Sequence, residues 1–297
     1  MDPPSIVGAR RSSVRARGVD FNITEAGARD GRPVVALHGW PQHHYVYRDL
    51  LADPPPGLRI VAPDLPGYGW SGPAPHRWAK EDVSSDLLAL LDALGVEKAL
   101  LVGHDWGGYL GYLLAMRAPE RFEGFLALNI PHPWQTFRTA APHFWRFLTY
   151  MPLVASVGVP LHRRTRFVER LIGGALSNRG SMSSEEIRIF SERFRDPVCA
   201  AAARDTYRTF LLHEAPASVR KPEQRSVTVP VRGLHGVDDF AIHRALVKKE
   251  TAHADDYEIE YVEGCGHFIA DERPDLVRGH LIDRPGGRDR LAPSESC

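Results

Sequence analysis

The chain has 297 residues, the length of one large domain or of a domain that carries an inserted subdomain. Lysine plus arginine and aspartate plus glutamate both number 37, so charge gives no reason to expect a nucleic acid or an anionic membrane as partner. The apolar fraction of 43% allows a sizeable core, but no run of about 18 apolar residues could span a bilayer. We therefore expect a protein that acts on a small molecule.

Cysteine usage and the first residues bear on the compartment. Cys199, Cys265 and Cys297 are too few and too scattered for a disulfide framework. The opening segment, MDPPSIVGARRSSVRARG, lacks the apolar stretch of a secretory signal. These features predict a reduced, cytoplasmic protein. They leave the oligomeric state open, with a homodimer as one alternative.

The first elements in chain order alternate between strands and helices. Two short polar/apolar alternations around Arg17-Gly18 predict a hairpin at a sheet edge. Short, almost wholly apolar runs, typical of parallel strands buried on both faces, follow at 33–38, 58–63, 99–103 and 124–130. Helical patterns lie between them at 82–94 and 107–117. This alternation predicts an α/β fold with a mostly parallel, doubly wound sheet.

The alternation stops at Pro131. From 132 to 226 the chain shows helical periodicity and no convincing strand, whereas strand patterns return at 228–235 and 257–262 and a helix pattern follows at 272–282. We predict a helical cap at 132–226, inserted between the two parts of an α/β core at 1–131 and 227–297. Open α/β sheets bind ligands at the carboxyl edge, so the cap is expected there. The tail from about 284 is expected to be disordered.

The segment VGHDWGG, residues 102–108, follows a predicted strand and opens a predicted helix. This is the context of a nucleophile elbow, G-x-Nuc-x-G, in which small residues let strand and helix approach. The nucleophile position holds Asp105. A carboxylate needs no base to activate it, and the positive end of the following helix favours its ionised form. We predict that Asp105 is a covalent nucleophile; the alternative is a glycine-rich turn with a solvated aspartate.

A histidine and a second acid should follow the nucleophile in the order nucleophile, acid, histidine. VEGCGHF, residues 262–268, places His267 on a glycine-rich loop after the last strand. RGLHGVDDF, residues 232–240, supplies the acid, and the spacing from Gly236 favours Asp239 over Asp238. The other position where this acid occurs, after the strand at 124–130, holds Asn129, which cannot carry the charge.

Two backbone N–H groups are expected to form an oxyanion hole. HGWPQHHYVYR, residues 38–48, follows a strand and offers the N–H of Trp40, and the residue after the nucleophile offers that of Trp106. We expect a cis bond before Pro41 in this tight turn. DLPGYGWS, residues 64–71, is interpreted as a structural loop. The sequence lacks a metal-ligand spacing such as H-x-x-x-H with Glu, so neither a metal nor a cofactor is expected.

HGWPQ, DLPGYGWS, GHDWGG and GCGHF together resemble the α/β-hydrolase superfamily, in its branch of epoxide hydrolases and haloalkane dehalogenases. The resemblance covers residues 30–131 and 228–282. In the epoxide hydrolases two cap tyrosines hydrogen-bond the ring oxygen. DTYRTFL (205–211) is similar to the second of these segments and implies Tyr207, and FLTYMPL (147–153) offers Tyr150 as the first. The alternative for each is a tyrosine that only packs within the cap.

The resemblance implies an epoxide hydrolase that opens a small apolar epoxide with water to a vicinal diol, through an ester on Asp105. A haloalkane dehalogenase that uses the same aspartate is the alternative, with the indole of Trp106, assisted by Trp40, holding the halide. Fluoroacetate dehalogenases carry arginine after the nucleophile, so Trp106 argues against that substrate. A non-catalytic ligand receptor on the same fold is a more remote alternative.

Overall fold

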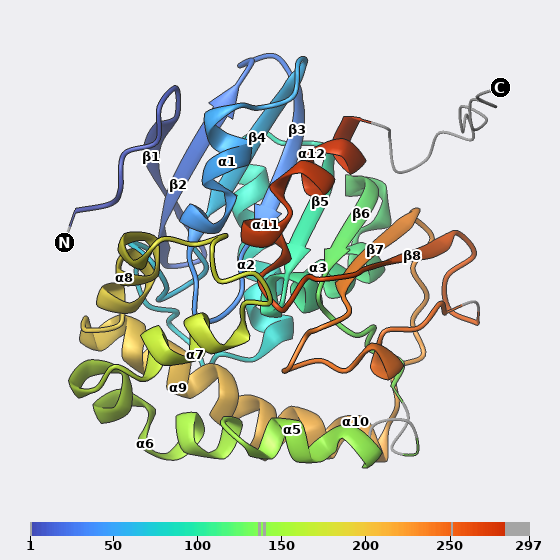
Figure 1. Cartoon of the computed structure of the whole chain (residues 1–297). Helices are drawn as coiled ribbons and strands as arrows, with labels where there is room; N and C mark the ends of the chain where they lie inside the picture. The colour runs from blue at the N-terminus through green and yellow to red at the C-terminus, as the bar shows by residue number, and fades with distance from the viewer. Residues whose placement is uncertain (1, 136–137, 139–140, 251, 283–297) are drawn as a thin grey trace, which may run out of the picture.

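The computed structural model describes residues 2–135, 138, 141–250 and 252–282, and its centre is an eight-stranded sheet (Figure 1). The strands are β1 (Arg10–Ala16), β2 (Val19–Gly27), β3 (Arg32–Leu37), β4 (Leu58–Pro63), β5 (Ala99–His104), β6 (Phe122–Leu128), β7 (Val231–Gly236) and β8 (Tyr257–Val262). Their order across the sheet is β1-β2-β4-β3-β5-β6-β7-β8. Only β2 runs against the others, pairing antiparallel with β1 and β4. The predicted hairpin and the mostly parallel sheet are confirmed.

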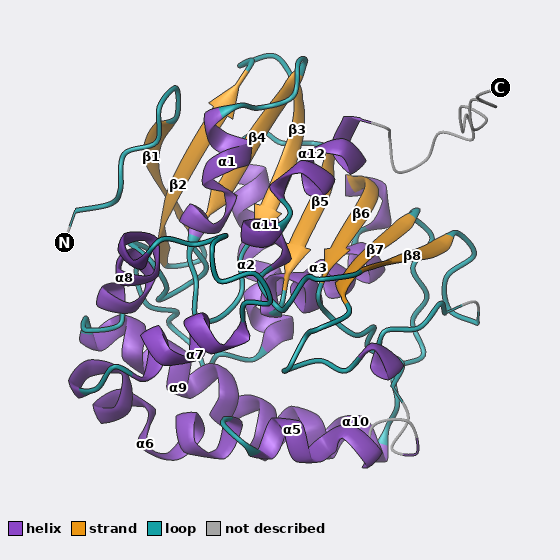
Figure 2. Ribbon diagram, in the orientation of Figure 1, coloured by secondary structure: helices purple, strands orange, loops and turns teal. Residues whose placement is uncertain are grey.

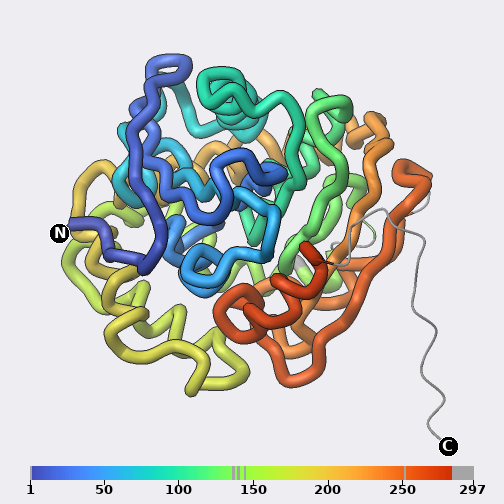
Figure 3. The backbone as a smooth tube through the Cα atoms, turned by 90° about the horizontal axis from the view of Figure 1, so that it is seen from above, coloured from blue at the N-terminus to red at the C-terminus, as the bar shows by residue number. Residues whose placement is uncertain are grey.

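Helices cover both faces of this sheet. They are α1 (Arg48–Ala52), α2 (Lys80–Ala93), α3 (Trp106–Arg117), α11 (Ile269–Glu272) and α12 (Pro274–Ile282), with short 3-10 turns η1 (His44–Tyr47), η2 (Pro119–Arg121) and η5 (Arg244–Leu246). Viewed from above, α2 and α3 lie on one side of the strands and α1, α11 and α12 on the other (Figure 3). This double cover explains why every residue of β5 is buried and apolar runs mark the central strands.

The helix expected at 272–282 is divided in the structure. α11 ends at Glu272 and α12 begins at Pro274, with Arg273 between them in a non-helical conformation. Proline lacks the N–H that a continuing helix would need, but it fits the first position of a new helix. The periodicity therefore indicated the helix correctly and missed its interruption.

The segment between β6 and β7 is helical. It contains η3 (Ala141–His143), α5 (Phe144–Leu148), α6 (Met151–Arg164), α7 (Phe167–Ala175), α8 (Ser184–Arg193), α9 (Pro197–Thr209), the π-helical turn η4 (Phe210–Glu214) and α10 (Ala215–Arg220). No strand occurs in the described part of 132–226. The arrowheads of β3, β5 and β6 point toward these helices, which therefore lie at the carboxyl edge of the sheet (Figure 2). We call residues 132–226 the cap segment. The tail predicted to be disordered lies outside the described residues.

The face that α9 turns toward the rest of the molecule is made of small side chains. Cys199, Ala200 and Ala203 are buried there, and Tyr207 follows on the same side one turn after Ala203. Asp196 caps the start of the helix by accepting the N–H of Val198 at 2.8 Å. Small residues let the helix approach closely, so the one large side chain in this row, Tyr207, reaches the sheet edge.

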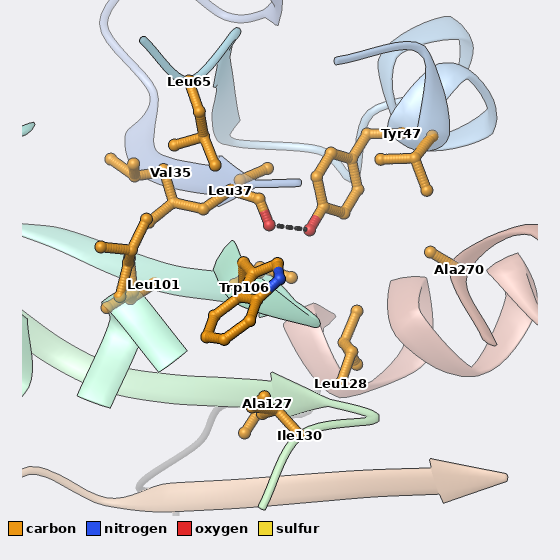
Figure 4. Packing of buried hydrophobic residues seen from close by; sticks show 14 of the residues in the cluster. Val35, Leu37, Tyr47, Leu65, Leu101, Trp106, Ala127, Leu128, Ile130 and Ala270 are labelled. Atoms are coloured by element: carbon orange, nitrogen blue, oxygen red, sulfur yellow. Dashed lines mark hydrogen bonds between the residues drawn. The ribbon is translucent and has the colours of Figure 1, made fainter. Parts of the chain in front are cut away.

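The core continues up to the carboxyl ends of the central strands. Figure 4 shows Leu37, Leu101 and Leu128 from three neighbouring strands packed in one cluster near Trp106. The hydroxyl of Tyr47 donates to the carbonyl of Leu37 at 2.8 Å, which ties η1 to the end of β3. Each fully buried leucine contributes about 2 kcal/mol, so this cluster holds the strand ends in fixed positions. Among the described helices, none is long and apolar enough to cross a membrane.

Candidate active site

Asp105 occupies the turn between β5 and α3. Its backbone has φ 50° and ψ −123°, in the left-handed half of conformational space that residues with a side chain seldom adopt. The turn is tight because a Cβ atom at Gly107 would collide with the carbonyl oxygens of Leu37 and His38 on the neighbouring strand. The glycine pattern read from the sequence is thus explained by a close crossing of backbones, which holds the Asp105 side chain above the sheet edge.

Both predicted oxyanion-hole donors contact the Asp105 carboxylate. The N–H of Trp40 donates to Asp105 Oδ2 at 2.9 Å, and the N–H of Trp106 is a second donor. Gly39 makes this approach possible, since a Cβ there would collide with the carboxylate. Burial raises the pKa of Asp105 to about 6, opposed by His267 and by the two N–H groups. The carboxylate is therefore ionised at neutral pH. The bond before Pro41 is cis, as predicted.

His267 lies between the two carboxylates. Its Nε2 is 3.8 Å from Asp105 Oδ1, and its Nδ1 is 2.9 Å from Asp239 Oδ2. The ring of His104 packs beside that of His267, and its Nε2 is 2.8 Å from the His267 carbonyl oxygen. Burial alone would lower the pKa of His267, but the charges of Asp239 and Asp105 outweigh burial and raise the pKa to about 9. The imidazole is therefore held by one acid and faces the other.

Asp239, and not Asp238, is the acid at the histidine. Asp239 is buried, and its Oδ1 accepts the N–H groups of Ala241 and Ile242 at 2.8 and 2.9 Å. Burial would raise the pKa of Asp239, but His267 and the hydrogen bonds lower it overall. Asp238 is exposed and accepts a hydrogen bond from Ser177 Oγ at 2.6 Å. The geometry thus favours the first of the two acids that the sequence offered.

Asn129 has a part in the site that the sequence did not reveal. Its Nδ2 donates to Asp239 Oδ2 at 2.7 Å and to the carbonyl of Gly266 at 3.1 Å. Its backbone has φ 44°, a conformation that asparagine tolerates better than most residues. Asn129 therefore does not replace the acid. It orients the Asp239 carboxylate and holds the loop that carries His267.

A cavity of about 620 Å³ opens above these groups. Asp105, His267, Trp40, Tyr150 and Tyr207 all line it. Most of the remaining wall is apolar, from Leu161, Phe167, Leu171, Ala175, Phe240 and Ala241. The cavity lies between the core and the cap segment, so its floor comes from the sheet and its roof from helices. It is suited to a small, largely apolar molecule.

The two predicted tyrosines meet in this cavity from different cap helices. Tyr150 precedes α6 and Tyr207 lies in α9, and their rings are 5.6 Å apart at 84°. The Trp40 ring stacks on Tyr150 at 5.7 Å and meets Tyr207 edge-on at 5.1 Å. Burial, followed by the charge of Asp105, raises the pKa of Tyr150, and burial raises that of Tyr207 as well. Both hydroxyls therefore keep their protons.

His162 is a second residue that sequence reasoning missed. The indole N–H of Trp40 donates to His162 Nε2 at 3.1 Å, while His162 Nδ1 is 2.6 Å from the carbonyl oxygen of Gly158. Nδ1 must then carry the proton and Nε2 the lone pair. Burial lowers the pKa of His162 to about 4, which keeps the ring neutral. The cap segment thus fixes the orientation of the Trp40 ring, and no local motif around His162 signals this.

His43, His44 and Asp64 form a buried group whose ligand atoms lie close enough to hold a metal ion. The Asp64 oxygens, however, already accept hydrogen bonds from the backbone and ring of His44, from Asn22 and from the N–H of Trp70, all at 2.8 to 2.9 Å. Asp64 therefore stabilises the loop at 64–71, which agrees with the structural interpretation of that loop.

Comparisons with known proteins place this geometry in a family. A model of the alpha/beta hydrolase fold matches residues 32–241. The AB hydrolase superfamily protein YfhM of Bacillus subtilis (strain 168) is 28% identical over 289 residues, which cover 93% of this chain and 98% of the relative. Epoxide hydrolase 4 of Mus musculus is 25% identical over 280 residues, covering 90% and 76%.

Among solved structures, Epoxide Hydrolase A from Mycobacterium thermoresistibile superposes with a TM-score of 0.74 at 25% identity, covering 93% of this chain and 97% of that one. The family model spans most of the chain, and the sheet order, the elbow and the resemblance carried by the four sequence motifs agree with it. The chain belongs to the alpha/beta hydrolase fold family.

Proposed function

We propose that this hydrolase is an epoxide hydrolase that works through a covalent ester on Asp105. One observation carries the proposal: a buried carboxylate and two protonated tyrosines line the same cavity, with a histidine and a second acid behind the carboxylate. A nucleophile and hydrogen-bond donors to the leaving oxygen are the groups that epoxide opening needs. The epoxide hydrolases among the relatives support the same reading.

In the first half-reaction, an Asp105 oxygen bonds to one epoxide carbon and the bond from that carbon to the ring oxygen breaks. The electron pair of the broken bond stays on the oxygen, which Tyr150 and Tyr207 stabilise by hydrogen bonds until it takes up a proton from water. The hydroxide that this leaves is neutralised by the proton that His267 then releases. A phenol suits this role because it still donates a hydrogen bond at neutral pH. The product is a hydroxyalkyl ester of Asp105.

In the second half-reaction, His267 removes a proton from water, which attacks the ester carbonyl carbon. Esterification removes the Asp105 charge that helps to raise the pKa of His267, so the imidazole releases its own proton more easily and becomes available as a base. The N–H groups of Trp40 and Trp106 hold the tetrahedral oxyanion, where losing one such donor costs about 3–4 kcal/mol. Collapse of this intermediate frees the diol and restores Asp105.

The intact-protein mass tests the covalent step. Asp105→Ala is expected to abolish turnover of styrene oxide and to show no added mass. His267→Gln is expected to gain the mass of one epoxide and to lose it slowly, because only hydrolysis needs the base. If His267→Gln forms diol without ever carrying the added mass, the covalent mechanism is wrong.

Haloalkane dehalogenation is the second candidate, and one observation favours it. The indole N–H of Trp106 is buried and has no acceptor in full hydrogen-bond geometry, but it lies close enough to the Tyr207 hydroxyl to oppose the rise in the pKa of that phenol, so a halide would meet it beside Tyr207. The indole N–H of Trp40 is already bonded to His162, which leaves that halide without its second expected donor. Halide release from a bromoalkane, with no diol from styrene oxide, would favour the dehalogenase. A ligand that binds but undergoes neither reaction would favour the receptor.

A further inference from the structure

Lys80 is a buried cation close to the candidate active site. It is the first residue of α2, and its side chain is only 1% exposed. Its Nζ donates to Glu214 Oε2 at 2.6 Å and to the carbonyl of Thr206 at 2.8 Å. Removing a charge from water is costly unless it is paired and hydrogen-bonded. The Lys80 ammonium is therefore a charge that is kept buried, by Glu214 and the Thr206 carbonyl, at the junction between a core helix and the cap segment.

One set of Lys80 contacts leads to the nucleophile turn. Nζ lies 4.4 Å from the centre of the Trp106 ring and 5.3 Å from that of Phe210. A cation over an indole face at this distance is attracted to it, most strongly where water is absent. The ring belongs to the residue whose backbone N–H contacts Asp105. Lys80 thus packs against the Trp106 side chain, whereas the Trp106 N–H belongs to the backbone turn at Asp105.

The other set of contacts leads to Tyr207. Thr206 immediately precedes it, and the Thr206 carbonyl that Lys80 binds lies where the regular α9 pattern ends: the N–H of Phe210 is shared between the carbonyls of Thr206 and Tyr207. The π-helical turn η4 begins at Phe210, and such turns concentrate at functional sites. Lys80 therefore holds the backbone next to Tyr207 at the point where the helix changes its winding.

Glu214 completes the connection at the end of η4. Its Oε1 accepts the backbone N–H of Lys80 at 2.8 Å, and its Oε2 accepts the ammonium. Burial lowers the pKa of Lys80 to about 8, while Glu214 and Asp105 oppose that effect. The side chain therefore remains largely charged at neutral pH, and both ends of Glu214 are bound to one residue of the core.

We propose that Lys80 is a positioning residue for epoxide opening, which fixes the Tyr207 segment of the cap relative to Trp106 at the elbow. The inference rests on the proposed function. It predicts a division between the half-reactions, because Tyr207 is needed when the epoxide opens, whereas ester hydrolysis depends on His267 and the oxyanion hole. A displacement of about 1 Å in such a group can cost about 100-fold in rate.

The test uses the full-length His267→Gln protein, in which the ester accumulates, with and without Lys80→Met. Ester formation from styrene oxide is followed by intact-protein mass at increasing times. Ester decay is followed in the same way after the excess epoxide has been removed. Lys80→Met is expected to slow formation by about 100-fold and to change decay by no more than about twofold.

Arg48→Met in the same background is the matched control. Arg48 also joins the core to the cap segment: it pairs with Glu186 on α8 at 2.6 Å and with the buried Asp271 on α11. None of these contacts involves Trp106 or the Tyr207 segment. Loss of Arg48 is expected to lower the melting temperature with little change in ester formation. Equal slowing in the Arg48 and Lys80 variants would mean general loosening of the cap, and the proposal would be wrong.

Glu214→Gln carries the test if Lys80→Met does not fold. The Glu214→Gln variant keeps Lys80 and removes the carboxylate charge that pairs with its ammonium. Ester formation is therefore expected to slow more than in Arg48→Met. Formation at the rate of His267→Gln alone would overturn the role of Lys80. Failure of His267→Gln itself to form any ester would instead overturn the proposed function, so the two failures are distinguishable.

Discussion

The two sides of the cavity are built in different ways. On the core side, Asp105, His267 and Asp239 follow strands of one sheet, and each is held by backbone hydrogen bonds or by a neighbour on the next strand. On the cap side, Tyr150 and Tyr207 come from separate helices and are aligned by ring contacts with Trp40. We infer that the core side sets the chemistry of the ester, and that the cap side sets how the substrate meets it.

The largest effect is expected on the core side. Asp239→Asn keeps the shape of the side chain but removes the charge that stabilises protonated His267 and fixes its tautomer, so turnover should fall by about 10⁴-fold. Ester formation should fall far less, and the ester should accumulate. Steady-state diol production and intact-protein mass measure the two effects. Asp238→Asn is the control, because that carboxylate is exposed and should matter little.

On the cap side, Tyr207→Phe should slow ester formation by about 100-fold, because the opening oxygen loses a hydrogen-bond donor. Tyr150→Phe should act in the same direction, and ester decay should stay nearly unchanged in both. Tyr45→Phe, which alters a tyrosine at the contact of η1 with α8, serves as the control. Accumulation of ester in Tyr207→Phe would contradict the division between the two sides.

The buried Asp105 carboxylate on the core side should lower the free energy of unfolding. Burial raises the pKa of Asp105 from 3.8 to about 6, so above pH 6 the folded protein holds a carboxylate that is more easily ionised in the unfolded chain. Asp105→Asn should therefore raise the free energy of unfolding at pH 7 by about 3 kcal/mol. The gain should shrink as the pH falls through 6 and vanish below about pH 4. Urea unfolding at several pH values measures it.

The smallest effect is expected at Asn129, which supports the acid and touches no substrate. Asn129→Ala removes one donor from Asp239 and should slow ester hydrolysis by about tenfold, with ester formation unaffected. The difference can be measured in the same mass experiment. A change in ester formation as large as the change in hydrolysis would show that this amide also shapes the cavity.

The core side could be predicted well from the sequence, because its signals are local. VGHDWGG contains both the proposed nucleophile and the glycines that its turn requires. The loop spacing singled out Asp239, which the structure places at His267. The supporting residues are joined by contacts between distant segments: Trp40 and His162 are 122 positions apart, and Lys80 and Glu214 are 134 apart. Such pairs depend on how the cap helices pack, which periodicity does not specify. The break at Arg273 is different, because the proline that follows it is a local signal that the periodicity alone did not take into account.

Trp40 contributes to the cavity both through its backbone N–H and through its indole ring. Its backbone N–H donates to Asp105, and any residue other than proline would supply that group. Its indole ring, by contrast, contacts both tyrosines. If the proposed function holds, changes of side chain at position 40 should therefore alter which epoxides are accepted, and from which face, while leaving the anchored aspartate intact. The backbone of Trp40 would then contribute to reactivity, and its side chain to selectivity.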